Sequence, residues 1–193
     1  MKKYELTDDT ITVGSRILHR IKALKDFADV EEGELGGYVE REDNLDHSGE
    51  AWVCEDAQVY GNALVYGNAL VYGNARIYGN ARVCGNARIC GNARICGNAR
   101  ICGNARICGN ARICGNARIY GENDYTTAKG FGRKYRTTTF FRLKDGGIGV
   151  RCGCFYGTLE EFREKVKETH KESKMGKEYL MLADLMEYKF KNA

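Results

Sequence analysis

The chain of 193 residues contains no proline, and its repetitive middle has no acidic residue between positions 57 and 120. Proline removes a backbone donor, so its absence favours a middle section of uninterrupted strand pairing. Histidine is scarce. The chain contains three, His19, His47 and His170, and all lie outside the perfect repeats. The chain also lacks a GxxxxGK[ST] segment and any apolar run long enough to cross a membrane. These absences argue against a membrane-spanning protein, a P-loop nucleotide hydrolase and a histidine base within the repeats.

The middle of the chain instead contains a repeat of six residues, which runs GNALVY twice, GNARIY, GNARVC and then GNARIC five times. Within each unit the residues alternate between small or aliphatic and charged or polarisable, which is the period of a half-buried strand. A helix would carry a glycine in every unit at a cost of about 1 kcal/mol each. Gly and Asn tolerate positive φ and are expected to turn the corners. The repeat therefore predicts a solenoid of short parallel strands, with alanine and the aliphatic residue facing inward.

The pattern of an aliphatic residue with alanine four positions later, and asparagine just before that alanine as in Asn86-Ala87, resembles the hexapeptide-repeat left-handed β-helix family. The resemblance implies that three hexapeptides make one coil, so that residues eighteen apart stack. The twelve aliphatic positions from Val53 to Ile119 would then give about four coils. Members of the family usually form trimers, and many are acyltransferases. One departure is that Tyr or Cys follows the aliphatic residue here.

The segments on either side of the repeat predict small end domains. The stretches GELGGYVEREDNLDHSGEAWV and GVRCGCFYGTLEEF resemble uncharacterised hexapeptide-repeat proteins of phages, prophages and anaerobic bacteria. Thr158 and Glu161 form a capping-box pair that predicts a helix start, and Gly176 is expected to separate this helix from a second one. The fold expected is mainly β: an N-terminal β cap with an acidic lead-in (1–46), a left-handed parallel β-helix (47–121), a linker (122–136) and a C-terminal ββαα module (137–193).

Positive charge is concentrated on the outward strand position of the repeat. Stacking by eighteen would place these arginines in three columns of like charge, which attract an anion or stand as a solvated face. A second basic cluster follows the repeat. The candidate ligand-binding residues are Arg76, Arg82, Arg88, Arg94, Arg100, Arg106, Arg112, Arg118, Lys129, Arg133, Lys134 and Arg136.

Seven of the nine cysteines take the other outward position of the repeat. The chain opens without a signal-peptide pattern, so we expect a cytoplasmic protein with reduced thiols that fill and shield the strands. The alternative is that this column forms a self-association face. Metal binding is not expected, because zinc needs four ligands that converge on one point and the side chains of a flat column do not. Disulfides between adjacent coils are not expected either, because parallel side chains would give a strained dihedral. Cys152, Cys154 and His170 are either three metal ligands or packed core groups, and we favour core groups. No metal or cofactor is expected.

These features favour a non-catalytic, oligomeric binding protein of phage or prophage origin in the bacterial host cell. Its ligand would be an anionic small molecule, for example a nucleotide captured as part of a counter-defence. Two alternatives stay open: a structural or assembly scaffold, and a hexapeptide-repeat acyltransferase. No catalytic residue is assigned, because no histidine or interrupting loop lies within the coils.

Overall fold

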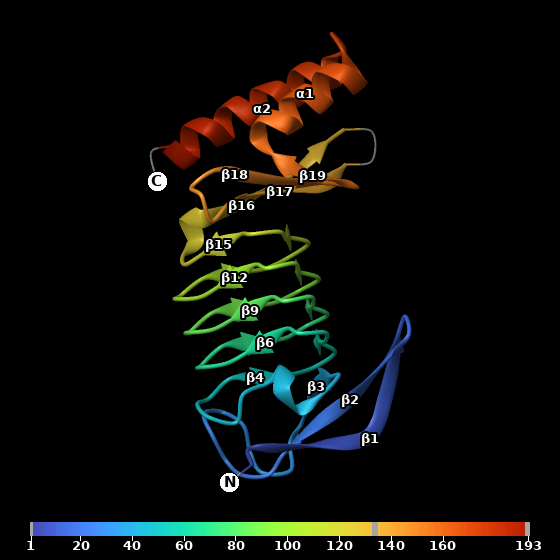
Figure 1. Ribbon diagram of the computed structural model, residues 1–193, viewed down its shortest axis with the longest axis vertical. Coiled ribbons are helices and arrows are strands. Elements are labelled where there is room, and N and C mark those ends of the chain that lie inside the picture. Colours follow the sequence, from blue (N-terminus) through green and yellow to red (C-terminus); the bar gives the residue numbers. More distant parts are fainter. Residues whose placement is uncertain (1, 133–134, 192–193) are drawn as a thin grey trace.

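The computed structural model describes residues 2–132 and 135–191. A parallel β-solenoid of about five turns forms the middle of the molecule, with a β-sheet cap at one end and a sheet covered by two helices at the other (Figure 1). The longer elements are β1 (Tyr4–Val13), β2 (Arg16–Ala23), β3 (Leu35–Val39), β16 (Tyr125–Phe131), β17 (Arg136–Arg142), β18 (Ile148–Cys152), β19 (Phe155–Thr158), α1 (Leu159–His170) and α2 (Lys174–Lys191), with short 3-10 turns at Glu42–Asn44 and Glu122–Asp124.

The solenoid itself is built from twelve strands of two residues each. Strands three apart in sequence pair in parallel, which confirms that residues eighteen apart stack. In every unit the alanine and the aliphatic residue are at most 1% exposed, so together they form the core. The strands are β4 (Trp52–Val53), β5 (Gln58–Val59), β6 (Leu64–Val65), β7 (Leu70–Val71), β8 (Arg76–Ile77), β9 (Arg82–Val83), β10 (Arg88–Ile89), β11 (Arg94–Ile95), β12 (Arg100–Ile101), β13 (Arg106–Ile107), β14 (Arg112–Ile113) and β15 (Arg118–Ile119).

Glycine and asparagine have different structural roles at the corners of the coil. Every repeat glycine from Gly61 to Gly115 has φ between 64° and 73°, a region that side chains avoid. The expectation that asparagine shares this conformation is wrong, because none of the described asparagines has a positive φ. Their side-chain amides instead bond from coil to coil, for example Asn80 Nδ2 to Asn98 Oδ1 at 3.1 Å. The repeat therefore needs glycine for the backbone turn and asparagine for the side-chain hydrogen bonds between adjacent coils.

The first coil precedes the recognisable repeat. Tyr38 and Val39 in β3 pair in parallel with β5, and Leu45 bridges to Val65. With β4, which lies in the β-helix expected over 47–121, these residues complete a coil. Its first two sides lie in the segment expected to be an acidic lead-in (1–46), so the solenoid has about five turns where about four were expected. The equivalent inward residues are Val39, Leu45 and Val53, which lie opposite Val59, Val65 and Val71. They are spaced six and then eight residues apart, so the second step breaks the period of six.

The N-terminal segment closes the open end of this first coil. The antiparallel hairpin β1–β2, expected from the sequence, joins the solenoid sheet through β3. Lys3 Nζ donates to the carbonyl oxygen of Ala51 at 2.7 Å, and Asn44 Nδ2 donates to that of Ala63 at 2.8 Å. Tyr4 Oη lies 2.9 Å from the carbonyl oxygen of Leu45. These side chains satisfy backbone carbonyls that an unpaired edge would leave open.

The C-terminal module has two strands more than expected, because β18 and β19 replace one expected strand and β16 is added. β16, in the segment expected to be a linker, pairs with β17, so the sheet is four-stranded with the order β16-β17-β18-β19. The capping box at Thr158 starts α1 as predicted. Gly176 does not separate the helices but lies inside α2, where an added Cβ would stand 2.5 Å from the carbonyl oxygen of Lys171. Glycine there allows the start of α2 to pass close to the end of α1.

This module covers the other end of the solenoid. Phe141 on β17 is fully buried in the solenoid core, while Phe140 beside it faces the helices and contacts Phe162. Thr139 Oγ1 accepts a hydrogen bond from the backbone N–H of Arg112 at 3.0 Å, which joins β17 to the last coil. No described helix is long and apolar enough to span a bilayer.

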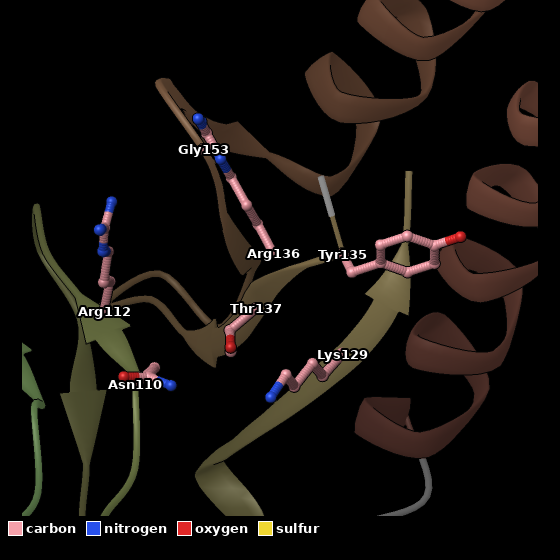
Figure 2. A pocket seen from close by; sticks show the side chains of 7 residues that line it. All are labelled: Asn110, Arg112, Lys129, Tyr135, Arg136, Thr137 and Gly153. Atoms are coloured by element: carbon pink, nitrogen blue, oxygen red, sulfur yellow. The ribbon is translucent and has the colours of Figure 1, made fainter. Parts of the chain in front are cut away.

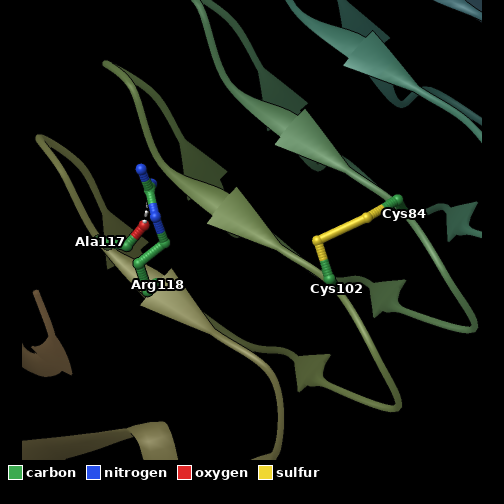
Figure 3. Close-up of a disulfide and its surroundings, with 4 residues drawn as sticks. All are labelled: Cys84, Cys102, Ala117 and Arg118. Atoms are coloured by element: carbon green, nitrogen blue, oxygen red, sulfur yellow. Dashed lines mark hydrogen bonds between the residues drawn. A yellow bond between two sulfur atoms is a disulfide. The ribbon is translucent and has the colours of Figure 1, made fainter. Parts of the chain in front are cut away.

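Two pairs of cysteines on adjacent coils are joined as disulfides, Cys84–Cys102 (Figure 3) and Cys90–Cys108. The expectation that the outward thiols stay reduced is therefore wrong for these four residues. The pairing register brings the Cα atoms of each pair to 4.7 Å, which lies within the range that a disulfide spans. The one-coil repeat thus places cysteines at bonding distance wherever two follow each other in a column.

Replacing both Cys84 and Cys102 with serine is expected to lower the free energy of unfolding by about 2–4 kcal/mol, because the cross-link restricts the unfolded chain over a separation of 18 residues. Urea unfolding of the double variant and the parent chain without reductant measures the loss. Under reducing conditions the two proteins should unfold at nearly the same urea concentration. A difference that persists unchanged in reductant would instead mean that serine packs poorly at this corner.

Candidate functional site

The arginines of the repeat form three columns, one on each face of the solenoid. The registers pair Arg76 with Arg94 and Arg94 with Arg112, which confirms the first predicted column. The other two columns are likewise in register and consist of Arg82, Arg100 and Arg118, and of Arg88 and Arg106. Adjacent guanidinium groups therefore leave the backbone about 4.8 Å apart, and each column is a line of closely spaced positive charge.

The surroundings of the three columns differ. Arg118, at the end of one, turns back to the backbone and donates to the carbonyl oxygens of Ala117 (Figure 3) and Asn98, each at 3.1 Å. Arg88 borders a hollow of about 460 Å3 that also contains Glu34 and Glu50, so carboxylates lower the positive potential there. The column that ends at Arg112 leads to a further group of cations.

That group lines a pocket of about 450 Å3 between the last coil and the C-terminal sheet. Arg112 enters it from β14, Lys129 from β16 and Arg136 from the first position of β17. In Figure 2 the side chains of Arg112 and Lys129 stand on either side of Thr137, while the ring of Tyr135 points away toward the helices. The residues that line the pocket are Asn110, Arg112, Lys129, Tyr135, Arg136, Thr137 and Gly153.

The local sequence explains why these three cations meet. Thr139 accepts from the backbone of Arg112, so the start of β17 is held against the end of β14. The pairing of β16 with β17 then brings Lys129 back toward the same place. The short connection between β16 and β17 includes Gly132 at φ 73° and Tyr135 at φ 47°. This turn sets where the strand bearing Arg136 begins.

The pocket is rich in donors and poor in counter-charge. Its described lining contains three cationic side chains, an amide, two hydroxyl groups and no carboxylate. All three cations are exposed, and among the described residues no carboxylate forms an ion pair with any of them. Elsewhere the chain does pair its arginines, for example Arg163 with Asp184 and Glu187 at 2.7 and 2.6 Å. A pocket of this composition favours an anion, because guanidinium and ammonium groups donate to phosphate or carboxylate oxygens.

The structure brings together three of the twelve predicted site residues, Arg112, Lys129 and Arg136. Arg76 and Arg94 continue the column away from the pocket, while Arg82, Arg100, Arg118, Arg88 and Arg106 lie on the other two faces. Arg133 and Lys134 lie outside the described residues. Asn110 and Thr137 were missed, and the repeat offers no signal for Asn110 because every unit contains the same asparagine.

A second, more apolar pocket of about 320 Å3 contains Cys152, Cys154 and His170. Thr138 Oγ1 donates to the sulfur of Cys152 at 3.2 Å, and the ring of Tyr179 lies beside His170. Within the described ranges no group of three or more His, Cys, Asp or Glu side chains could hold a metal ion. Cys152 packs partly buried between the sheet and the helices, whereas Cys154 is exposed, so the expectation of packed core groups does not hold for Cys154.

Comparison with known families bears on the solenoid alone. A family described as YdcK Beta solenoid repeat matches residues 57–73, 75–91, 87–103 and 111–122, all of them in or next to the coils. No curated protein matches the chain. Together with the stacked parallel strands, this similarity shows that the chain is a β-solenoid repeat protein.

Proposed function

We propose that the protein is a non-catalytic binding protein that holds a phosphorylated small molecule, such as a nucleotide, in the basic pocket at the end of the solenoid. The observation that carries the proposal is the convergence of Arg112, Lys129 and Arg136 on a pocket whose described lining has no carboxylate. Its volume of about 450 Å3 is within the usual range for small-molecule sites. The solenoid would act as the rigid support for this site.

The chemistry of the lining favours phosphate over other anions. The planar fork of a guanidinium matches two phosphate oxygens, and Arg112 and Arg136 supply two such forks from different elements. Lys129 adds a point charge, while Asn110 and Thr137 add neutral donors. The described lining contains no histidine, cysteine or carboxylate to serve as a base or nucleophile, so we propose binding without turnover.

The remaining parts of the proposal depend on the resemblance to hexapeptide-repeat proteins. We propose left-handed coiling, a homotrimer, a phage or prophage origin, and capture of a nucleotide in the bacterial cytoplasm as its use. Met181 and Leu185 on the outer face of α2 are 71% and 57% exposed, which favours a self-association surface on the C-terminal module. Light scattering of the purified protein tests the oligomer number.

Replacing Arg112, Lys129 and Arg136 together with glutamine is expected to abolish binding of nucleoside triphosphates, and each single replacement should weaken it about 10- to 100-fold, since hydrogen bonds to charged groups are worth about 1.5–3 kcal/mol. Isothermal titration with ATP, GTP and inorganic pyrophosphate measures the affinities at two salt concentrations.

Arg106→Gln is the matched control, because Arg106 occupies the same position of an identical repeat on another face. Because Arg106 does not line the pocket, its replacement removes no contact with the ligand. The affinity should change less than 2-fold, which corresponds to a binding free energy change of about 0.4 kcal/mol. Equal weakening by Arg106→Gln would mean that the anion binds diffusely along the rod. The absence of saturable binding by any of the three probes would refute the proposed function.

A further inference from the structure

One pair of cysteines in the solenoid stays reduced although it has the same register as the two disulfides. Cys96 and Cys114 follow the paired strands β11 and β14, in which Ile95 lies opposite Ile113. They are therefore placed like Cys84 and Cys102, one coil apart, and adjacent rungs put their Cα atoms about 4.8 Å apart, within disulfide range. In the structure both are free thiols.

The two thiols are unequal. Cys114 is only 9% exposed, whereas Cys96 is half-buried. The ionised form of Cys96 is favoured by a side-chain hydrogen bond from Cys114, by another from Tyr78 and by the charge of Arg151. Together they lower the pKa of Cys96 below its usual value, and the hydrogen bond from Cys114 has the largest effect. The same hydrogen bond raises the pKa of Cys114 well above its ordinary value.

A thiolate that is accessible and stabilised by a buried thiol is the arrangement of a nucleophile beside its resolving cysteine. We propose that Cys96 and Cys114 form a reactive dithiol that reduces low-molecular-weight disulfides and in doing so closes a third disulfide across the coils. This site is separate from the basic pocket and does not depend on the proposed function.

The reaction has two exchange steps. The thiolate of Cys96 attacks one sulfur of the small disulfide, which forms a mixed disulfide and releases one thiolate. Cys114 then gives its proton to the released thiolate and attacks the sulfur of Cys96, releasing the second small thiolate. Counted from the Cys96 thiolate, the protein loses two electrons and one proton, and one small disulfide becomes a thiol and a thiolate that takes a proton from water.

The other free cysteines lack this arrangement. Burial raises the pKa of Cys54 to about 11, and its neighbour one coil along is Tyr72. Cys152 accepts a hydrogen bond from Thr138, and Cys154 lies in the turn that follows it. Each can form a mixed disulfide, but none has a cysteine opposite it on the adjacent coil.

The test must measure intact protein. Trypsin cleaves after each repeat arginine, so Cys90, Cys96, Cys102, Cys108 and Cys114 would all lie in the same peptide ICGNAR and could not be distinguished. The background is therefore the chain with Cys54→Ser, Cys152→Ser and Cys154→Ser, in which the only free thiols expected are Cys96 and Cys114. The probe is oxidised glutathione, and intact mass with maleimide labelling reports adducts and free thiols.

We expect the background protein to lose both free thiols without keeping an adduct, and its mass to fall by two hydrogens. Adding Cys114→Ser should trap one glutathione on Cys96, whereas adding Cys96→Ser should leave Cys114 at least 10-fold less modified. A stable adduct on the background protein, equal modification of the two single variants, or no reaction at all would overturn the proposal. If the triple background unfolds, the wild-type chain gives the same comparison, since Cys114→Ser should carry one adduct more than Cys96→Ser.

Discussion

Replacing Gly97 with alanine is expected to lower the free energy of unfolding by about 3–4 kcal/mol, against about 1 kcal/mol for the same change at Gly109. Both glycines have φ of 69°, so the conformational cost of adding a side chain is the same. An added Cβ at Gly97 would stand 2.7 Å from the backbone nitrogen of Gly115, whereas at Gly109 it would meet nothing within 4 Å. The difference between the two variants is therefore the cost of separating two coils.

The geometry explains why the two positions differ although their repeats are identical. The residue one coil beyond Gly97 is Gly115, but the chain leaves the solenoid at Gly121, before a coil can form over Gly109. Urea unfolding followed by far-ultraviolet circular dichroism measures both losses. If the two variants lose equal stability, the constraint on the repeat glycine is its backbone conformation alone, and close stacking contributes nothing.

The coil and its columns could be predicted from sequence because each unit repeats the same burial pattern. Ala93 and Ile95 are buried and Arg94 is exposed, and the same holds one coil later, while one coil earlier Arg76 is half-buried between a buried Ala75 and Ile77. A period of six with three strands per coil then fixes which residues stack, so the arginine and cysteine columns follow without coordinates. Because the units are identical, the sequence does not show which of them contributes a residue to the pocket.

The basic pocket illustrates this limit. Arg94, Arg106 and Arg112 occupy the same repeat position, but only Arg112 lies beside Lys129 and Arg136. That placement depends on where the C-terminal sheet docks, through the contact of Thr139 with the last coil, and no local pattern encodes this. The disulfides were not expected, because parallel side-chain vectors predict a strained dihedral even where the Cα separation, here 4.7 Å, allows the bond.

The first two sides of the first coil were missed, and on its third side, which lay within the expected β-helix, burial no longer follows the repeat. Trp52 occupies the strand position that holds Leu70 one coil later and Arg88 after that, which is the outward face. It is nevertheless only 2% exposed, since the rings of Phe27 and Tyr4 cover it at centroid distances of 5.3 and 6.2 Å. The outward face of the first coil is thus the inner face of the N-terminal cap.

Replacing Trp52 with alanine is accordingly expected to lower the free energy of unfolding by about 3–5 kcal/mol, the usual loss for a large buried ring. It should also expose the edge of the first coil, so the variant should aggregate at concentrations where the parent chain is soluble. Trp52 is the single tryptophan, so unfolding of this variant must be followed by circular dichroism, whereas in the parent chain its fluorescence reports on the cap itself.

Leu70→Ala provides the control, because Leu70 holds the same strand position one coil further along and is only half-buried. It should lose about 1 kcal/mol, in proportion to the smaller apolar area that it removes from water. If Trp52→Ala loses no more than Leu70→Ala, the N-terminal segment merely lies beside the first coil. A large loss confined to Trp52 means that the cap and the coil fold as one unit, so that the solenoid depends for its stability on a segment outside its repeats.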